Sequence, residues 1–284
     1  MKTMVFNFLY KFFLAIGIVF LLLPIYLNIS TMVSDDTISN NYLTMPTGLI
    51  EMYDEKIAKI DNLDNLKKLV DYDIKKNNFA GIDIPIYIDD IVRRKYFHQV
   101  AYISADTNWI LKIADYFFPE YFFLTAMDPK DLMMKNHGIC NQQSIIFQEL
   151  IKDYTFEYAS IVFDIKIPNQ KNFGHFATTV KVGSDWFYFD SNMEPVYDRK
   201  NSLIFKKVLE ADKEVLKKLY PQYNFDLLTK EMIDLRDLNR FPAKRGVMFQ
   251  KITQFLSNFS WFLFLIFSLL IKSIGLKKEG PVME

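Results

Sequence analysis

The single cysteine of this chain lies where a thiol could be activated for chemistry. Cys140 follows Gly138 in the segment NHGICNQQSIIFQELIK, and the periodic run after the cysteine predicts a helix. A thiol at a helix start faces unpaired backbone N–H groups and the positive end of the helix dipole, and both favour the thiolate. The same N–H groups can donate to an oxyanion during acyl transfer. A lone cysteine is more often a small buried apolar residue, but these polar flanks favour a nucleophile.

A histidine and an aspartate lie on the two arms of a predicted hairpin, in the segment GHFATTVKVGSDWFYFD. Gly183 and Ser184 suit a two-residue turn with glycine first. The predicted register pairs Val182 with Asp185, Lys181 with Trp186, Thr179 with Tyr188 and Ala177 with Asp190. Because side chains alternate along a strand, His175 is then the diagonal neighbour of Asp190 on the same face. A three-residue loop would move Asp190 to the other face.

Together these residues predict a catalytic set in which Asp190 fixes the tautomer of His175, and His175 deprotonates Cys140. Taken singly, each has a plainer interpretation, because His175 could pack at a sheet edge and Asp190 could cap the turn that follows it. His137 is a rival base, three residues before the thiol. His98, in the basic run RRKYFH, is interpreted as structural.

At these residues the chain resembles the transglutaminase-like superfamily, which shares the papain-like fold. The pattern of that family is a G-x-C at a helix start, a histidine that begins a strand, and an aspartate after an aromatic strand. Here those elements are Gly138 to Cys140, His175, and Asp190 at the end of DWFYFD. The resemblance covers roughly residues 90–198, and the upstream segment RRKYFHQVAYISADTNWILKIADYF is similar to the helical lead-in of some bacterial members.

The resemblance implies thiolate attack on an amide carbonyl, an acyl-enzyme thioester, and transfer of the acyl group to water or an amine. The expected substrate is a peptide, a protein or an amide of the cell envelope. The chain departs from the family in YTFEYASIVFDI, which carries no arginine where many members have one. The side-chain donor to the oxyanion stays open among Asn136, Gln142 and Trp109. The alternative function is an inactive scaffold or binding module for envelope assembly.

The composition excludes several other classes of function. Lys and Arg together number 34, and Asp and Glu together number 34. The chain therefore lacks the positive net charge that would indicate a nucleic-acid partner. One cysteine excludes an internal disulfide and a thiolate-rich zinc site. Three histidines leave little for a histidine metal cluster. We therefore expect no metal, no cofactor and no nucleic acid.

Hydrophobic residues are concentrated at both ends of the chain. Residues 12–29 form a run without charge that nearly crosses a hydrocarbon core of roughly 30 Å. Lys2 and Lys11 precede this run and Asp35 and Asp36 follow it, so the positive-inside rule places the N-terminus in the cytoplasm. The competing interpretation is a cleaved signal peptide, although no small-x-small cleavage site follows the run.

Residues 252–271 form a second uncharged run with polar residues in its first half and lysines after it. A second span is the prediction, and an interfacial or core helix is the alternative. Two spans put both termini in the cytoplasm and residues 34–250 outside, so the lipid bilayer is an expected partner. The expected location is the cell membrane, with an extracytoplasmic soluble domain on the periplasmic or cell-surface side.

Between the two runs, the periodicity predicts helices first and strands later, which is typical of an α+β domain. Helices are expected over 47–76, 88–118, 141–154 and 201–220, and strands at SIVFDIKI, HFATTVKV and DWFYFD. The expected fold is a papain/transglutaminase-like domain, with a cysteine-bearing helix packed on an antiparallel sheet. The expected parts are an anchor (1–33), a helical lead-in (34–87), the transglutaminase-like domain (88–220), a linker (221–250), and a transmembrane helix with its tail (251–284).

Overall fold

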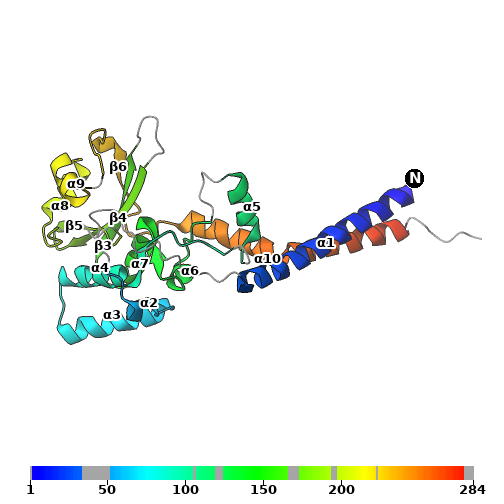
Figure 1. The fold of residues 1–284 in the computed structure, drawn as a ribbon, viewed down its shortest axis with the longest axis horizontal. Helices are drawn as coiled ribbons and strands as arrows, with labels where there is room; N and C mark the ends of the chain where they lie inside the picture. The colour runs from blue at the N-terminus through cyan, green and yellow to red at the C-terminus, as the bar shows by residue number, and fades with distance from the viewer. Residues whose placement is uncertain are drawn as a thin grey trace, which may run out of the picture. The chain divides into compact units, whose positions relative to one another are not determined.

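The computed structural model describes residues 2–33, 52–104, 107–118, 124–165, 173–192, 197–221 and 223–277. Within these ranges the chain forms ten α-helices, a four-stranded antiparallel sheet and a small two-stranded sheet (Figure 1). The predicted α+β class is therefore confirmed. The chain divides into two compact units, of which the first comprises residues 1–37, 102–125 and 245–284, and the second comprises residues 38–101 and 126–244.

The first unit is helical, and the second contains both sheets. The first unit holds α1 (Lys2–Val33), α5 (Trp109–Phe117) and nearly all of α10 (Lys244–Lys277). The second unit holds α2 (Glu55–Ala58), α3 (Leu63–Asn77), α4 (Asp83–Lys95), β1 (Phe97–His98), α6 (Pro129–Met133), β2 (His137–Gly138), α7 (Cys140–Ile151), β3 (Glu157–Ile165), β4 (Phe173–Val182), β5 (Asp185–Phe189), α8 (Leu203–Leu209), α9 (Lys213–Leu219), the 3-10 turn η3 (Lys230–Met232) and β6 (Ile233–Arg236).

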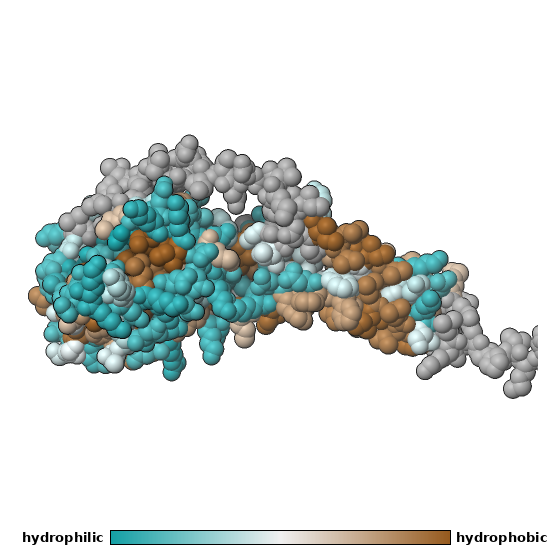
Figure 2. Space-filling view, turned by 90° about the horizontal axis from the view of Figure 1, so that it is seen from below, coloured by the Kyte–Doolittle hydropathy of each residue, from teal (hydrophilic) through white to brown (hydrophobic). Residues whose placement is uncertain are grey.

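Two helices of the first unit are long and apolar enough to cross a membrane, over Met4–Leu23 in α1 and Lys244–Gly275 in α10. Only 6% and 17% of these segments are buried, which disfavours the alternative of a core helix. Their outward side chains form the hydrophobic surface of the helix pair in Figure 2. The first apolar segment starts earlier than the predicted run at residue 12, because α1 is already helical and apolar from Met4.

The two apolar helices run antiparallel and pack closely. Phe6 near the start of α1 touches Gly275 near the end of α10, and the Ser268 hydroxyl donates to the Tyr10 carbonyl at 3.2 Å. Further along, Gly17 packs on α10 so tightly that an added Cβ would lie 3.0 Å from Leu265 Cδ2. Small residues permit such close approach between apolar helices. The start of α1 and the end of α10 therefore lie side by side.

The strand order of the four-stranded sheet is β5-β4-β3-β6, and all three pairings are antiparallel. The predicted hairpin register is confirmed, because Val182 pairs with Asp185, Lys181 with Trp186 and Thr179 with Tyr188. Gly183 adopts φ 64°, the left-handed backbone that a glycine at the start of this turn supplies.

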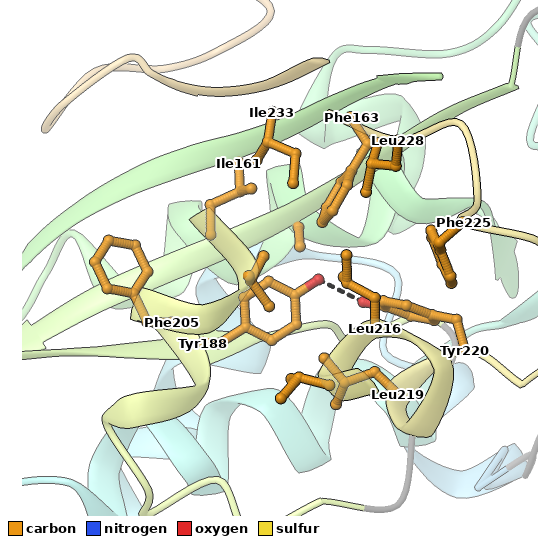
Figure 3. Close-up of a cluster of buried hydrophobic side chains, with 13 residues drawn as sticks. Ile161, Phe163, Tyr188, Phe205, Leu216, Leu219, Tyr220, Phe225, Leu228 and Ile233 are labelled. Carbon is orange, nitrogen blue, oxygen red and sulfur yellow. Dashed lines mark hydrogen bonds between the residues drawn. The ribbon is translucent and has the colours of Figure 1, made fainter. Parts of the chain in front are cut away.

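Helices cover both faces of this sheet. On one face, the Gln148 amide of α7 donates to the hydroxyls of Ser160 and Thr178, and Phe147 stacks on Phe189. On the other face, α8 and α9 close a hydrophobic core (Figure 3), which comprises Ile161, Phe163, Ala177, Tyr188, Phe205, Val208, Val215, Leu216, Leu219, Tyr220, Phe225, Leu228 and Ile233. His175 lies on this second face, since it shares the side of β4 with Ala177.

Three expectations about the chain's organisation are wrong. Residues 88–118 are not continuous helices, because β1 follows α4 and pairs in parallel with β2. The expected linker 221–250 contains β6, an edge strand that pairs with β3 and places Ile233 in the core. Residues 102–118, assigned to the soluble domain, belong instead to the unit with the apolar helices. Pro119 and the segment 121–123 lie outside the described residues.

Candidate functional site

Cys140 is the first residue of α7, as the sequence predicts, and its side chain is partly exposed. The strand β2 leads directly into it, with Ile139 as the extended residue before the helix. Gly138 packs closely at this entry, because an added Cβ would lie 3.3 Å from Gln143 Cγ and that side chain would have to shift by a few tenths of an ångström. The Gly138 carbonyl accepts from the Gln143 amide at 2.9 Å. The thiol is therefore held at the start of a helix whose entry is tightly packed.

His175 is buried near the start of β4 and is held between two aromatic rings. Its ring centroid lies 5.5 Å from that of Phe163 and 5.2 Å from that of Tyr220. Its Nε2 lies 2.7 Å from Asp190 Oδ2. Its other ring nitrogen, Nδ1, is buried and makes no hydrogen bond within the described residues, and the Cys140 thiol is near enough to this imidazole to help raise its pKa. The structure thus brings Cys140, His175 and Asp190 together.

Asp190 directly follows β5 and is fully enclosed. Besides His175, the Tyr220 hydroxyl donates to Oδ2 at 2.7 Å, and the Asn192 backbone N–H donates to Oδ1 at 3.1 Å. The Arg93 guanidinium donates to the Asp190 carbonyl at 3.0 Å. Both the side chain and the backbone of this residue are therefore fixed. Asp190 therefore both bonds the His175 imidazole and caps the turn that follows it.

A buried charge network lies behind Asp190 and holds the turn after β5. Asp89 of α4 forms ion pairs with Arg93 at 3.0 Å and with Arg199 at 2.9 Å, and it accepts from the Ser191 hydroxyl at 2.6 Å. Removing one partner of a buried, hydrogen-bonded ion pair lowers the stability of a protein, because the other charge is left buried without a partner. This network joins α4 to the turn that carries the carboxylate.

The electrostatics favour a charged pair of His175 and Asp190. Burial lowers the pKa of His175, but the charge and hydrogen bond of Asp190 outweigh burial, and with a smaller contribution from Cys140 they raise this pKa to about 10. Burial raises the pKa of Asp190, but His175, Tyr220 and Asn192 outweigh it and lower this pKa to about 2. The buried pair is therefore an imidazolium and a carboxylate at neutral pH.

Tyr220, which sequence reasoning missed, is a positioning residue for this carboxylate. It follows the last residue of α9, and its hydroxyl contacts the hydroxyl of Tyr188 (Figure 3). The same hydroxyl also contacts Asp190. Burial raises the pKa of both tyrosines well above the ordinary value, so both hydroxyls keep their protons. No local signal marks Tyr220, because it is 30 residues from Asp190 and meets it only through the packing of α9 on the sheet.

We expect Tyr220→Phe to raise the pKa of Asp190, since a hydrogen bond that favours the carboxylate is lost. A hydrogen bond to a charged group contributes roughly 1.5–3 kcal/mol. The acid-unfolding midpoint of the protein should therefore move to higher pH. The matched control is Tyr197→Phe, which removes a hydroxyl bonded to the Tyr188 carbonyl at 2.9 Å and leaves Asp190 untouched. Equal midpoints for the two variants would contradict a specific role for Tyr220.

His98 is the second residue of this site that the sequence did not indicate, since it was interpreted as structural. Its strand β1 pairs with β2, so that His98 lies opposite Gly138. Burial lowers the pKa of His98 and the charge of His175 lowers it further, while a hydrogen bond with Asn192 and the charge of Asp190 oppose this shift. His98 is therefore a mainly neutral imidazole at neutral pH, near the His175 and Asp190 side chains.

Two of the three expected oxyanion donors are already engaged. Gln142 donates both amide hydrogens to backbone carbonyls, of Ala101 at 2.7 Å and of Ala126 at 2.8 Å. Trp109 lies in the other unit and donates its indole N–H to the Ser257 carbonyl at 2.8 Å. Neither N–H is directed at an oxyanion, because each satisfies a backbone carbonyl.

Asn136 and the rival base His137 lie just before the thiol. The amide of Asn136 makes one long contact, of 3.5 Å, to the Tyr53 hydroxyl, and its Oδ1 lies 2.9 Å from His137 Nδ1. His137 also packs on the Phe97 ring at 5.4 Å. Asn136 therefore stays a candidate donor, while His137 is oriented by an amide rather than by a carboxylate such as Asp190.

Over the described parts of the chain, no group of three or more His, Cys, Asp or Glu side chains is arranged to hold a metal ion. The arrangement instead brings together a thiol, an imidazole and a carboxylate. No family model matches this chain, and neither the curated proteins nor the solved structures compared with it include a match.

Proposed function

We propose that this protein is a membrane-anchored thiol enzyme of the transglutaminase-like type that acts on amide bonds. The observation that carries the proposal is the position of the His175 imidazole, which bonds Asp190 through Nε2 and interacts with the Cys140 thiol. A papain-like fold is part of the proposal. It is supported by a helix that begins at the cysteine and packs on an antiparallel sheet whose next strands carry the histidine and lead to the aspartate.

The proposed reaction proceeds in two steps. The Cys140 thiolate attacks the amide carbonyl carbon, and the C–N bond breaks as the His175 imidazolium gives its proton to the leaving amine, which leaves a thioester. Water or an acceptor amine then attacks the thioester, His175 takes the proton, and the thiolate is released. The backbone N–H at the start of α7 is suited to stabilise the oxyanion of both steps. Asp190 keeps the imidazole oriented and stabilises its charge.

The membrane anchor is supported by two apolar, mostly exposed helices that run antiparallel. Antiparallel spans put both termini on one side of the bilayer, and the lysines at residues 2 and 11 favour the cytoplasm for that side. The catalytic unit then works outside the cytoplasm, on a peptide, a protein or an amide of the cell envelope.

The proposal predicts that iodoacetamide labels Cys140 faster in the folded protein than in the urea-unfolded chain. The expected acceleration at neutral pH is at least about tenfold, because the imidazolium and the helix start favour the thiolate. Mass spectrometry of the intact chain measures the rate directly, since Cys140 is its single thiol. Equal rates in the two states would refute an activated nucleophile and favour the scaffold alternative.

His175→Ala should bring the labelling rate of the folded protein close to that of the unfolded chain. The matched control is His137→Ala, which removes the rival base three residues from the thiol. Far-UV circular dichroism checks that both variants stay folded. Slow labelling of Cys140 in His137→Ala together with fast labelling in His175→Ala would assign the base to His137 instead.

A further inference from the structure

The helical unit contains a short helix whose position can be fixed along the two apolar helices. Phe6 meets Gly275 and Gly17 meets Leu265, so Leu23, at the end of the apolar segment of α1, lies at about the level of Ser257 on α10. A span of about 20 apolar residues matches the hydrocarbon core. The level of Leu23 and Ser257 is therefore one boundary between hydrocarbon and headgroups.

The helix α5 is attached to α10 at this level by hydrogen bonds. Trp109 donates its indole N–H to the Ser257 carbonyl at 2.8 Å, and the Ile110 N–H donates to the Ser257 hydroxyl at 3.2 Å. Asn108, the residue before α5, donates to Thr253 Oγ1 at 2.9 Å and to the Gln250 carbonyl at 3.1 Å. These contacts explain two polar residues in the first half of the second apolar run, Thr253 and Ser257, because both hold α5.

The same helix contacts the other apolar helix, since the Phe20 and Trp109 ring centroids are 5.1 Å apart. Beyond this attachment, α5 runs across the axis of α10 rather than along it (Figure 1). A helix that crosses a membrane-spanning helix at the boundary lies close to the plane of the membrane surface.

The outward face of α5 is apolar and aromatic. The exposed fractions are 48% for Ile113, 80% for Tyr116, 67% for Phe117 and 53% for Phe118. A contiguous exposed apolar patch marks a protein or membrane contact, and aromatic side chains are enriched where hydrocarbon meets headgroups. The neighbouring Lys112 is also exposed, and a lysine beside an apolar face suits the headgroup layer.

We propose that α5 is an interfacial helix that embeds Ile113, Tyr116, Phe117 and Phe118 in the lipid bilayer. These residues continue the lipid-facing surface of α1 and α10 at the level where the spans leave the hydrocarbon. The inference rests on α1 and α10 crossing a membrane, and it is independent of the chemistry at Cys140. It gives the chain a third membrane contact, at the level of Leu23 on α1 and Ser257 on α10.

The test places a nitroxide label at single cysteines in the full chain, with Cys140→Ser as background, in vesicles of phosphatidylcholine and phosphatidylglycerol. The labelled variants are Tyr116→Cys in α5, Leu263→Cys on the lipid-facing side of α10, and Leu203→Cys in the soluble unit. Leu203 is a matched control because it is apolar and 54% exposed on α8. Power saturation compares collisions with oxygen, which partitions into lipid, and with a water-soluble nickel complex.

We expect the ratio of oxygen to nickel accessibility at residue 116 to exceed that at residue 203 several-fold and to lie below that at residue 263. A ratio at residue 116 equal to that at residue 203 overturns the proposal. Spin–spin broadening at residue 116 that disappears on dilution with unlabelled protein also overturns it, because the face would then be covered by a second copy of the chain. A water-like ratio at residue 263 removes its premise.

Discussion

Cys140→Ala is expected to lower the turnover of an amide substrate by roughly 10⁴-fold or more, since removing a catalytic nucleophile costs rate enhancements of this order. The physical reason is that no other group in the proposed site can form the thioester. Hydrolysis of a set of peptide p-nitroanilides measures turnover. Intact-mass spectrometry after p-nitrophenyl acetate measures acyl transfer to the thiol, with an acetyl adduct on the natural chain and none on the variant.

Cys140→Ser is the companion variant, because it keeps a small polar side chain at the start of α7. It therefore separates the reactivity of the sulfur from the contribution of the side chain to packing. Both variants should keep the melting temperature of the natural protein within a few degrees, since the Cys140 side chain is only partly buried. Turnover that survives in both variants would show that the sulfur is not the nucleophile. Full cellular function of the alanine variant would favour the scaffold.

Asp190→Asn is expected to destabilise the fold by roughly 3–5 kcal/mol at pH 6, because it removes one partner of a buried, hydrogen-bonded ion pair. Without the carboxylate, burial is no longer outweighed and lowers the pKa of His175. The imidazole is then neutral at pH 7, and the labelling of Cys140 should slow at the same time. Urea unfolding of the full chain in detergent micelles, followed by tryptophan fluorescence, measures the change in stability.

The pH dependence of this change has a definite sign. The folded-state pKa of His175 is raised from 6.5 to about 10, so its contribution to stability is complete below pH 6.5 and is lost as the pH rises towards 10. The pKa of Asp190 is lowered from 3.8 to about 2, so its contribution is complete above pH 3.8 and is lost as the pH falls towards 2. The difference between the natural protein and the variant should therefore be largest between about pH 4 and 6.5 and shrink towards pH 10.

Glu157→Gln is the matched control on the same sheet. It removes one partner of the surface ion pair between Glu157 and Lys181, whose N–O distance is 2.8 Å. An exposed ion pair contributes about 0–1 kcal/mol, so this variant should unfold almost like the natural protein. A stability loss in Asp190→Asn that stays constant from pH 6 to pH 10 would contradict the charged state assigned to His175.

What the sequence determined by itself is local. A glycine-first, two-residue turn with even strand alternation fixes the register of β4 on β5, and that register brings His175 to the side of Asp190. The start of α7 at Cys140 follows from the glycine and the periodic run. The two apolar helices could also be predicted from the sequence, because recognising an uncharged run of this length requires no information from elsewhere in the chain.

What the tertiary structure decided depends on residues far apart in the chain. Tyr220 reaches Asp190 only because α9 packs on the sheet, and His98 enters the site only because β1 pairs with β2. Gln142 and Trp109 have suitable N–H groups, but backbone carbonyls in their neighbourhood already accept them. A sequence pattern specifies which donors and acceptors exist, whereas packing specifies which of them meet, since each buried polar group must find its partner in three dimensions.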